Sequence, residues 1–108
     1  MKPITFLGDS LEKVRSFPQQ ARRAVGYQLD RVQRGLMPED WKPMTSVGPG
    51  VYEIRIRDDA GAFRVMYIAK FAEAVYVLHA FQKKTRKTSA SDLEHARDRL
   101  KELLRSRK

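Results

Sequence analysis

The sequence contains no cysteine, which excludes disulfide bonds and thiolate metal ligands. No apolar run approaches the roughly 18 to 20 residues of a membrane-spanning helix, and Met1–Thr5 lacks the apolar region of a signal peptide. The chain has no Gly-rich phosphate loop, and its two histidines, His79 and His95, do not show metal-ligand spacing. We therefore expect a cytoplasmic protein that is not attached to a membrane and needs no metal or cofactor.

Acidic residues are scarce relative to basic ones. The 108 residues include 22 Lys and Arg against 13 Asp and Glu, a formal net charge of +9. Such an excess favours a polyanionic partner, either nucleic acid or an acidic protein. The alternative is a surface that is charged only for solubility. The hydrophobic share, 42%, is that of a globular protein, so we expect one domain over residues 1–108 with a modest core.

The middle of the chain predicts an antiparallel three-stranded meander. In Val51–Arg57, apolar and charged residues alternate with the period of two that a strand with one buried face requires. The turn Asp58–Gly61 leads to a second strand, Phe63–Lys70, and another short turn leads to a third, Ala74–Gln82. The second and third strands are more apolar and richer in aromatic and β-branched residues, so we expect them at the centre of the sheet.

The segments before the meander predict a short strand and a helical hairpin. Lys2–Phe6 is apolar and contains a proline, which favours an edge strand. Asp9, with a glutamate three residues later, predicts a capping box for a helix over Ser10–Phe17. A second helix is expected over Pro18–Arg34, where apolar residues recur at helical spacing and Gly35 can end it.

The fold class that follows is α+β. Met37–Gly50 has three prolines and two glycines and predicts a loop, in which Trp41 packs at the core edge or serves in recognition. Ser91 and Glu94 predict a capping box for a C-terminal helix over about Asp92–Arg105. We expect the N-terminal strand and the helical hairpin to pack on a small antiparallel sheet.

Basic side chains gather on the predicted meander. Arg55 and Arg57 share one face of the first strand, Arg64 begins the second, and Lys83 and Lys84 end the third. An antiparallel sheet can bring such strand-end residues together. Cleavage of RNA by attack of a 2′-hydroxyl on the neighbouring phosphate requires charge stabilisation, which arginines supply, and proton transfer, which a lysine of lowered pKa supplies. This chemistry needs no metal.

Two further side chains on the meander have open roles. Glu53 shares the face of Arg55 and is either a base or an ion-pair partner. His79 alternates with Val77 and Phe81, so we expect it on their face, either as a core residue or as a catalyst.

Two more basic regions flank the meander. The stretch KKTRKTSAS, residues 83–91, holds four cations that include Arg86 and Lys87, and the polar face of the second predicted helix carries Arg22 and Arg23. Each region either contacts RNA or is a solvated face.

Three stretches carry a resemblance to a known family, namely YEIRIRDDAGAFRVMYIA, VYVLHAFQKKTRKT and DLEHARDRLKELL. They and the order of elements resemble the RelE/ParE superfamily of bacterial toxins, in its HigB-like, phage-derived branch. The resemblance covers nearly the whole chain, and LHAFQKKT followed by a charged helix is its most specific part. It implies a RelE-like fold and the toxin of a type II toxin–antitoxin system.

The resemblance leaves the target open. RelE- and HigB-like members cut mRNA in the ribosomal A site without a metal and so inhibit translation, whereas ParE-like members bind DNA gyrase without nuclease activity. A non-catalytic RNA-binding module is a third possibility and would need exposed stacking aromatics. The first interpretation, a ribosome-dependent mRNA endoribonuclease, implies as partners the ribosome, mRNA and a cognate antitoxin with a helix-turn-helix DNA-binding domain. An acidic antitoxin segment would cover the basic face.

The resemblance also assigns residues by position. The cations of the first strand match the family's catalytic site, and Arg64 matches the arginine at the scissile phosphate. RelE-type enzymes place a tyrosine near the C-terminus, and this chain has none after Tyr76, so Lys84 and His79 are the candidates for proton transfer. The candidate catalytic residues are Arg55, Arg57, Arg64, Lys84 and His79, and the candidate RNA-binding residues are Lys83, Arg86, Lys87, Arg22 and Arg23.

Overall fold

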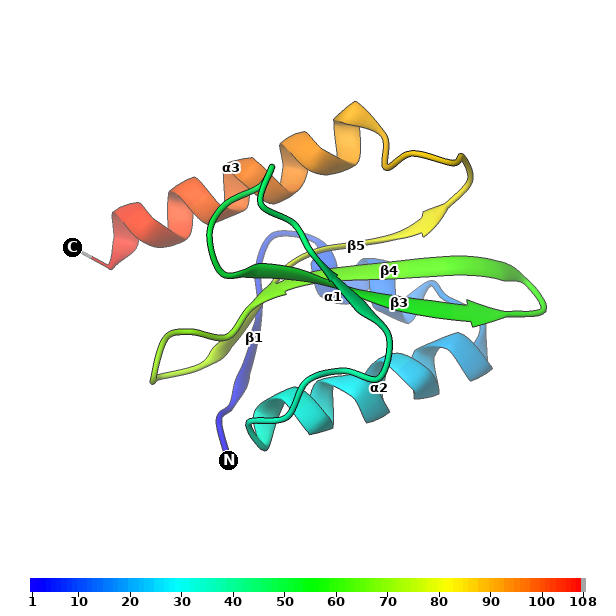
Figure 1. Ribbon diagram of the computed structural model, residues 1–108, viewed down its shortest axis with the longest axis horizontal. Helices are drawn as coiled ribbons and strands as arrows, with labels where there is room; N and C mark the ends of the chain where they lie inside the picture. The colour runs from blue at the N-terminus through cyan, green and yellow to red at the C-terminus, as the bar shows by residue number, and fades with distance from the viewer. Residues whose placement is uncertain (108) are drawn as a thin grey trace.

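A five-stranded sheet forms the middle layer of the protein, with helices on both faces (Figure 1). The computed structural model describes residues 1–107, and none of the helices in this range is long and apolar enough to cross a membrane. In chain order the elements are β1 (Ile4–Phe6), α1 (Ser10–Arg15), α2 (Gln19–Gln33), β2 (Trp41–Pro43), β3 (Val51–Asp58), β4 (Gly61–Ile68), β5 (Val75–Lys83) and α3 (Ala90–Ser106).

The strand order is β1-β5-β4-β3-β2. The predicted antiparallel meander is β3, β4 and β5, and the apolar strands β4 and β5 lie inside the sheet as expected. The predicted edge strand is β1, but it pairs with β5 in the parallel direction, with Ile4 opposite Val75. The α+β class is confirmed, and the sheet is mixed rather than purely antiparallel.

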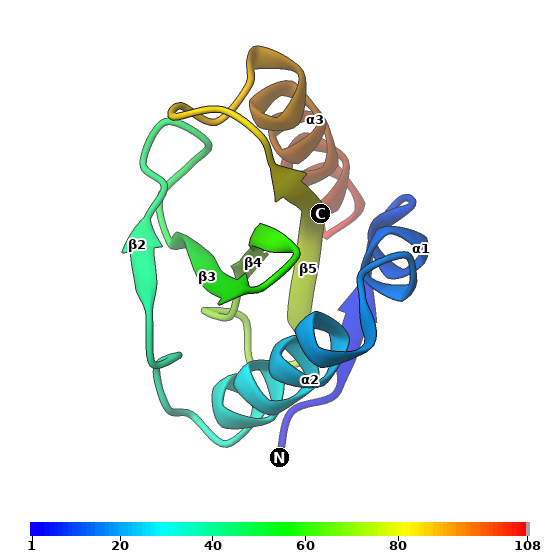
Figure 2. The same ribbon diagram turned by 90° about the vertical axis from the view of Figure 1, so that its right-hand side faces the viewer.

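Two apolar cores lie on opposite faces of the sheet, and Figure 2 shows α2 on one side of the strands and α3 on the other. On the first face, buried residues at helical spacing in α2, such as Val25 and Leu29, pack on alternate residues of the meander, such as Ile54 and Val65. On the second face, Leu100 of α3 packs in the other core. The polar faces of both helices remain in solvent.

The prediction of a loop over Met37–Gly50 is wrong for three of these residues. Trp41–Pro43 forms β2, an edge strand antiparallel to β3, with Trp41 opposite Ile54. Pairing with the free edge of β3 overrides the local proline and glycine signals, and a proline is tolerated on an edge strand because it lacks only one N–H group. The ring of Trp41 meets Tyr52 edge-on at 5.2 Å and keeps 39% of its exposure.

Both expected capping boxes are wrong. α3 begins earlier than predicted, because Ser89 is its N-cap and accepts a hydrogen bond from the Asp92 amide at 3.1 Å. Asp9 is the N-cap residue of α1, but its side chain does not cap the helix. Its carboxylate instead accepts a charge-assisted hydrogen bond from Arg99 at 2.5 Å, which is stronger than a neutral cap.

A β-bulge interrupts the pairing of β4 with β5. Met66 lies opposite His79, whereas Tyr67 lies opposite Val77, so Leu78 is an extra residue in β5. As a result, Leu78 packs in the core beneath α3 while His79 also contacts α3. The expectation that His79 shares the face of both Val77 and Phe81 is therefore wrong for Val77.

We predict that Leu100→Ala destabilises the protein by about 2 to 5 kcal/mol, because it leaves a cavity between α3 and the sheet. Leu100 is only 6% exposed. The matched control is Leu104→Ala on the same helix, where 45% exposure predicts a change within about 0.5 kcal/mol. Urea unfolding followed by circular dichroism measures both values. Equal losses in the two variants would contradict this packing of α3.

Candidate functional site

A cluster of cations lies on the α3-facing side of the sheet. Arg55 of β3 is directly opposite Arg64 of β4, and opposite residues in an antiparallel pair share a face. In the next row, Arg57 and Lys83 flank Ala62 from the two neighbouring strands. The register therefore brings together four of the predicted site residues, and we refer to Arg55, Arg57, Arg64 and Lys83 as the cation cluster. Like charges opposite one another destabilise a sheet, so the cluster requires a nearby negative charge to offset the repulsion.

Glu53 supplies that compensation from beneath the cluster. It is 2% exposed, Arg64 is 4% exposed, and the Arg64 Nε atom lies 3.5 Å from Glu53 Oε1. At that distance the contact is an ion pair without a well-formed hydrogen bond. Glu53 Oε2 and Arg64 Nε have no hydrogen-bond partner, while Arg64 also donates to the Phe63 carbonyl at 3.0 Å. Of its two open roles, Glu53 has the geometry of an ion-pair partner.

Burial perturbs each ionisable group of the ion pair. It raises the pKa of the Glu53 carboxyl above its usual 4.5, and the charge of Arg64 acts in the opposite direction. Burial also lowers the pKa of the Arg64 guanidinium, and the negative charge of Glu53 acts in the opposite direction by raising it. Both effects indicate a partly desolvated site in which electrostatic interactions are stronger than in water.

Lys83 is the lysine that the structure places within the cluster. It is half-buried, and desolvation lowers the pKa of its ammonium group below the usual 10.5, with the charges of Arg64 and Arg55 adding to the effect. Lys42 of β2, which lies opposite Glu53, adds another cation to this face. Sequence reasoning missed Lys42 because its strand was expected to be a loop, and no local pattern marks it.

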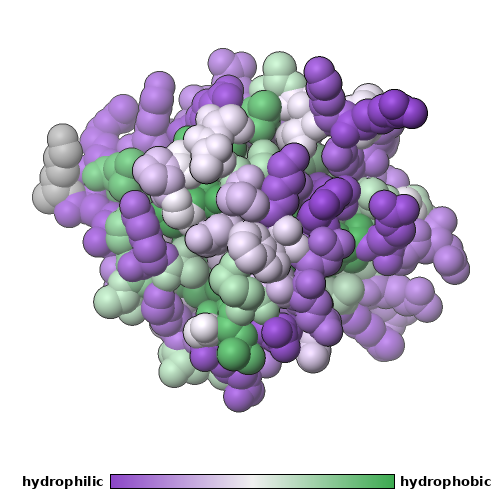
Figure 3. Space-filling model, viewed as in Figure 1, coloured by the Kyte–Doolittle hydropathy of each residue, from purple (hydrophilic) through white to green (hydrophobic). Residues whose placement is uncertain are grey.

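The loop after β5 extends the positive surface. A hollow of about 290 Å³ lies between β2 and this loop, with Lys42, Lys83, Arg86 and Lys87 among its lining residues. Lys84 lines the adjoining hollow, together with Lys83 and Lys87. Figure 3 shows hydrophilic side chains crowded on the right of the molecule, the side where the β3–β4 hairpin and this loop lie in Figure 1.

Arg22 and Arg23 lie elsewhere. Both are exposed on α2, which packs on the opposite face of the sheet from the cation cluster. The structure therefore does not bring them to the cluster, and a role for them in RNA binding would need a separate contact.

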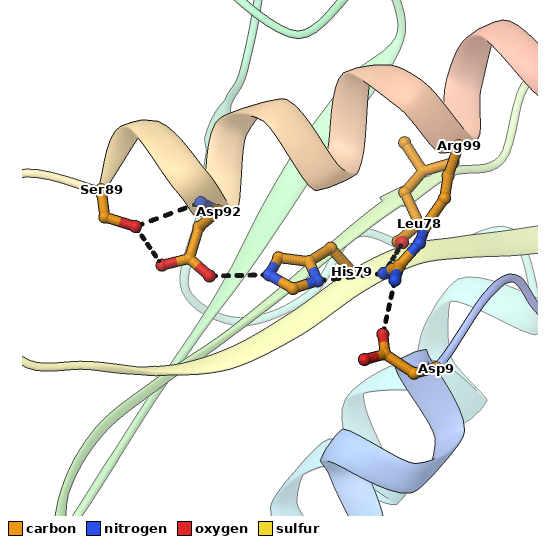
Figure 4. A network of polar contacts seen from close by, with 6 residues as sticks. All are labelled: Asp9, Leu78, His79, Ser89, Asp92 and Arg99. Atoms are coloured by element: carbon orange, nitrogen blue, oxygen red, sulfur yellow. Dashed lines mark hydrogen bonds and ion pairs between the residues drawn. The ribbon is translucent and has the colours of Figure 1, made fainter.

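His79 lies at the centre of a polar network beside the cluster (Figure 4). It is 2% exposed, with Nε2 at 2.7 Å from Asp92 Oδ1 and Nδ1 at 3.1 Å from an Arg99 nitrogen. A guanidinium group only donates, so Nδ1 must accept and the proton must reside on Nε2, which donates to Asp92. The imidazole is therefore neutral, and burial lowers its pKa below the usual 6.5.

The same network joins three elements of the fold. Arg99 of α3 donates to the Leu78 carbonyl at 3.0 Å and to Asp9 at 2.5 Å, and Asp92 also accepts from the Ser89 hydroxyl at 2.6 Å. Both ring nitrogens of His79 already have hydrogen-bond partners. The geometry therefore favours the role of a core residue over that of a catalyst. The sequence could not reveal Asp92 and Arg99 as its partners, since they belong to a different element.

The topology and the cation cluster define a class of protein. A helical hairpin and a C-terminal helix on a small sheet are consistent with the RelE-like fold. The family model described as Phage derived protein Gp49-like (DUF891) matches residues 12–101, most of the chain, so the protein belongs to this family. The Gp49-like family is part of the RelE/HigB-like group of toxins, which confirms the resemblance at the level of the family. A comparison with curated proteins gives no match.

The buried imidazole predicts a pH-dependent stability. The folded-state pKa of His79 is lowered, so the unfolded chain binds the proton first as the pH falls. The free energy of unfolding should therefore fall below about pH 6.5, with a slope of at most about 1.4 kcal/mol per pH unit, and be fully retained above it. Urea unfolding between about pH 8 and pH 5 measures this slope.

His79→Asn should remove this part of the pH dependence. His95→Asn, at the exposed histidine whose ring lies 5.2 Å from that of His79, should keep most of it, because burial is the largest cause of the lowered His79 pKa. Carboxylates remote from residue 79 titrate alike in all three proteins and cancel in the comparison, and the side-chain amide of His79→Asn can still donate a hydrogen bond to Asp92. If the slope were the same in the wild-type protein and His79→Asn, the assignment of a neutral His79 would be wrong.

Proposed function

We propose that the protein is the toxin of a type II toxin–antitoxin system and acts as a ribosome-dependent mRNA endoribonuclease that inhibits translation. The observation that supports this function is the convergence of Arg55, Arg64 and Lys83 around the buried Glu53. Converging cations of this kind are suited to a phosphate group. A protein that only inhibited DNA gyrase would have no need of them, so the nuclease is favoured over the ParE-like alternative.

The proposed reaction is an internal transesterification of RNA. The 2′-oxygen attacks the adjacent phosphorus, the bond to the 5′-oxygen breaks, and the products carry a 2′,3′-cyclic phosphate and a 5′-hydroxyl. Negative charge builds up on the non-bridging oxygens in the transition state. Arg55 can stabilise it by charge-assisted hydrogen bonds, with Arg57 at the flank, and the buried Arg64 opposite Arg55 adds its positive charge from within the sheet.

Lys83 is the best placed group for proton transfer. It lies one row from Arg64 across the sheet, and its pKa is lowered towards the working range of an acid–base catalyst. Lys84, which lines the adjoining hollow, is exposed and better suited to bind the RNA backbone together with Arg86 and Lys87. His79 acts in this proposal as a positioning residue, because it holds the start of α3 against β5.

The open shape of the site supports dependence on the ribosome. The cations lie on a sheet surface and in shallow hollows beside it, so the protein alone does little to orient a flexible RNA strand. Holding the attacking oxygen in line with the phosphorus contributes several orders of magnitude to such a reaction, and the ribosome would supply that orientation.

The proposal includes a cognate antitoxin, a helix-turn-helix DNA-binding protein, as the partner that silences the toxin in the cytoplasm. An acidic segment of this partner would pair with the cation cluster and with Lys42, and would thereby exclude the phosphates of RNA.

Cleavage of a defined mRNA, with and without programmed ribosomes, tests the proposed function. We expect cuts only with ribosomes, and a loss of about 10²- to 10³-fold for Arg55→Ala, which removes one charge-stabilising group. Arg34→Ala is the matched control, since it removes the same charge from an exposed pair with Asp30 on α2.

Arg64 is tested with a conservative substitution. Arg64→Ala would leave the buried Glu53 unpaired and lower the free energy of unfolding by about 3 to 5 kcal/mol. Arg64→Lys keeps the charge but loses the planar fork, and we expect it to be impaired while folded. If the wild-type protein cut no RNA under either condition, the nuclease would be excluded, and inhibition of gyrase supercoiling would be the next assay.

Lys83→Arg separates proton transfer from RNA binding. Arginine keeps the positive charge but cannot exchange a proton near neutral pH, so we expect kcat to fall by about 10²- to 10⁴-fold. Affinity for RNA should stay close to that of the wild-type protein. Single-turnover cleavage with programmed ribosomes measures the rate, and filter binding measures the affinity. A fully active Lys83→Arg variant would assign proton transfer to another group, with Lys84→Arg as the next test.

A further inference from the structure

The hollow between β2 and the loop after β5 is lined by cations. Its volume is about 290 Å³, and Lys42, Lys83, Arg86 and Lys87 are among its lining residues. No acidic residue of the described range, 1–107, lines it. We refer to it as the basic hollow. Pockets for drug-sized ligands measure about 300 to 1,000 Å³, so the basic hollow is suited to a small anion or a small phosphorylated molecule.

Lys83 is the least exposed cation of the basic hollow. It is half-buried, whereas Lys42, Arg86 and Lys87 are exposed. Met44, which is 5% exposed, lines the same hollow, so one part of its wall is apolar. The basic hollow therefore offers exposed cations that can hold a phosphate and, beside them, an amine that is partly shielded from water.

A lysine in this setting is more reactive towards electrophiles than an exposed lysine. Desolvation is the largest cause of the lowered pKa of the Lys83 ammonium group. The charges of Arg64, Arg55 and Lys42 act in the same direction, and the charge of Glu53 opposes them. At a given pH, a larger share of Lys83 is therefore the neutral amine, which is the nucleophilic form.

We propose that the basic hollow binds small acyl phosphates and that Lys83 is acylated by them. Arg86 and Lys87 hold the phosphate group by charge-assisted hydrogen bonds, which brings the acyl carbon beside the Nζ atom of Lys83. This arrangement raises the local concentration of the donor at one particular amine.

The reaction is an acyl transfer without oxidation or reduction. The neutral Nζ atom of Lys83 attacks the carbonyl carbon of the acyl phosphate. The bond from that carbon to the phosphate oxygen then breaks, and inorganic phosphate leaves with the electron pair. Nζ releases one proton to water, so the products are an amide on Lys83 and free phosphate.

An acyl group on Lys83 removes a positive charge and a group that exchanges protons. Both losses oppose the proposed cleavage of RNA, so acylation switches the site off. This regulatory effect rests on the proposed function, whereas the acylation itself does not. Thioesters of coenzyme A carry the same acyl groups but are drug-sized or larger, so small acyl phosphates are the donors that fit.

Mass spectrometry of the digested protein measures the acetylated fraction of each lysine after treatment with acetyl phosphate at about pH 8. We expect Lys83 to be acetylated about tenfold faster than Lys101, an exposed lysine on α3. In protein unfolded by urea, both lysines should react at the same rate. Equal rates in the folded protein would overturn the proposal, as would faster acetylation of Lys83 by acetyl coenzyme A than by acetyl phosphate.

A double variant with Arg86→Gln and Lys87→Gln tests the binding of the phosphate group. It should slow the acetylation of Lys83 by acetyl phosphate by about tenfold, but hardly change acetylation by p-nitrophenyl acetate, a donor without phosphate. The matched control, Arg22→Gln with Arg23→Gln, removes the same charge from the opposite face of the sheet and should react like the wild-type protein. Equal slowing with both donors, or no slowing, would refute the basic hollow as the donor site.

Binding of RNA tests the regulatory effect without requiring cleavage. Brief treatment with acetyl phosphate should weaken filter binding of RNA to the wild-type protein by about fivefold, because one cation of the site is neutralised. Lys83→Arg keeps its charge under this treatment and should keep its affinity. Equal losses in both proteins would overturn regulation through Lys83. Acetylation at Lys83 in a protein that cuts no mRNA with programmed ribosomes before treatment would contradict only the proposed function.

Discussion

The register of β4 between its two antiparallel neighbours is the constraint on which the rest of the structure depends. A shift of one residue would move every side chain of the strand to the opposite face. In the observed register, Val65 and Tyr67 face α2, while Arg64 and Met66 face α3. The same pairing places Arg55 beside Arg64, so the core and the cation cluster are set by one arrangement of backbone hydrogen bonds.

The cation cluster destabilises the sheet through repulsion between like charges, and the carboxylate of Glu53 offsets only part of this repulsion. The ion pair of Arg64 with Glu53 is buried, and a buried pair adds little stability because both charges lose their hydration. One oxygen of Glu53 and one nitrogen of Arg64 lack hydrogen-bond partners. A pair of apolar residues would fill the same space at a lower cost. Such arrangements are retained where function requires them, which is the stability–activity trade-off seen in many binding sites.

The periodic spacing of apolar residues predicts much of the fold. Most of the features that it does not predict are formed by tertiary contacts. The strands of the meander and both long helices follow from alternating or helical spacing of apolar residues, as does the clustering of Arg55, Arg64 and Lys83 near one end of the sheet. The strand around Lys42 exists only because β3 offers it a free edge. The bulge at Leu78 leaves no local signature, and His79 finds its partners on a helix more than ten residues further along the chain.

The contact between Asp9 and Arg99 has a consequence for the order in which the protein folds. It joins residues 90 positions apart, and through Arg99 it is coupled to His79 and the Leu78 carbonyl. During synthesis the meander is complete before α3 exists, but the face that carries the cations lacks its cover until α3 has been made. Contacts of such long range form slowly, because a large loop must close first. The nascent chain therefore completes this network only after Arg99 has left the ribosome that makes it.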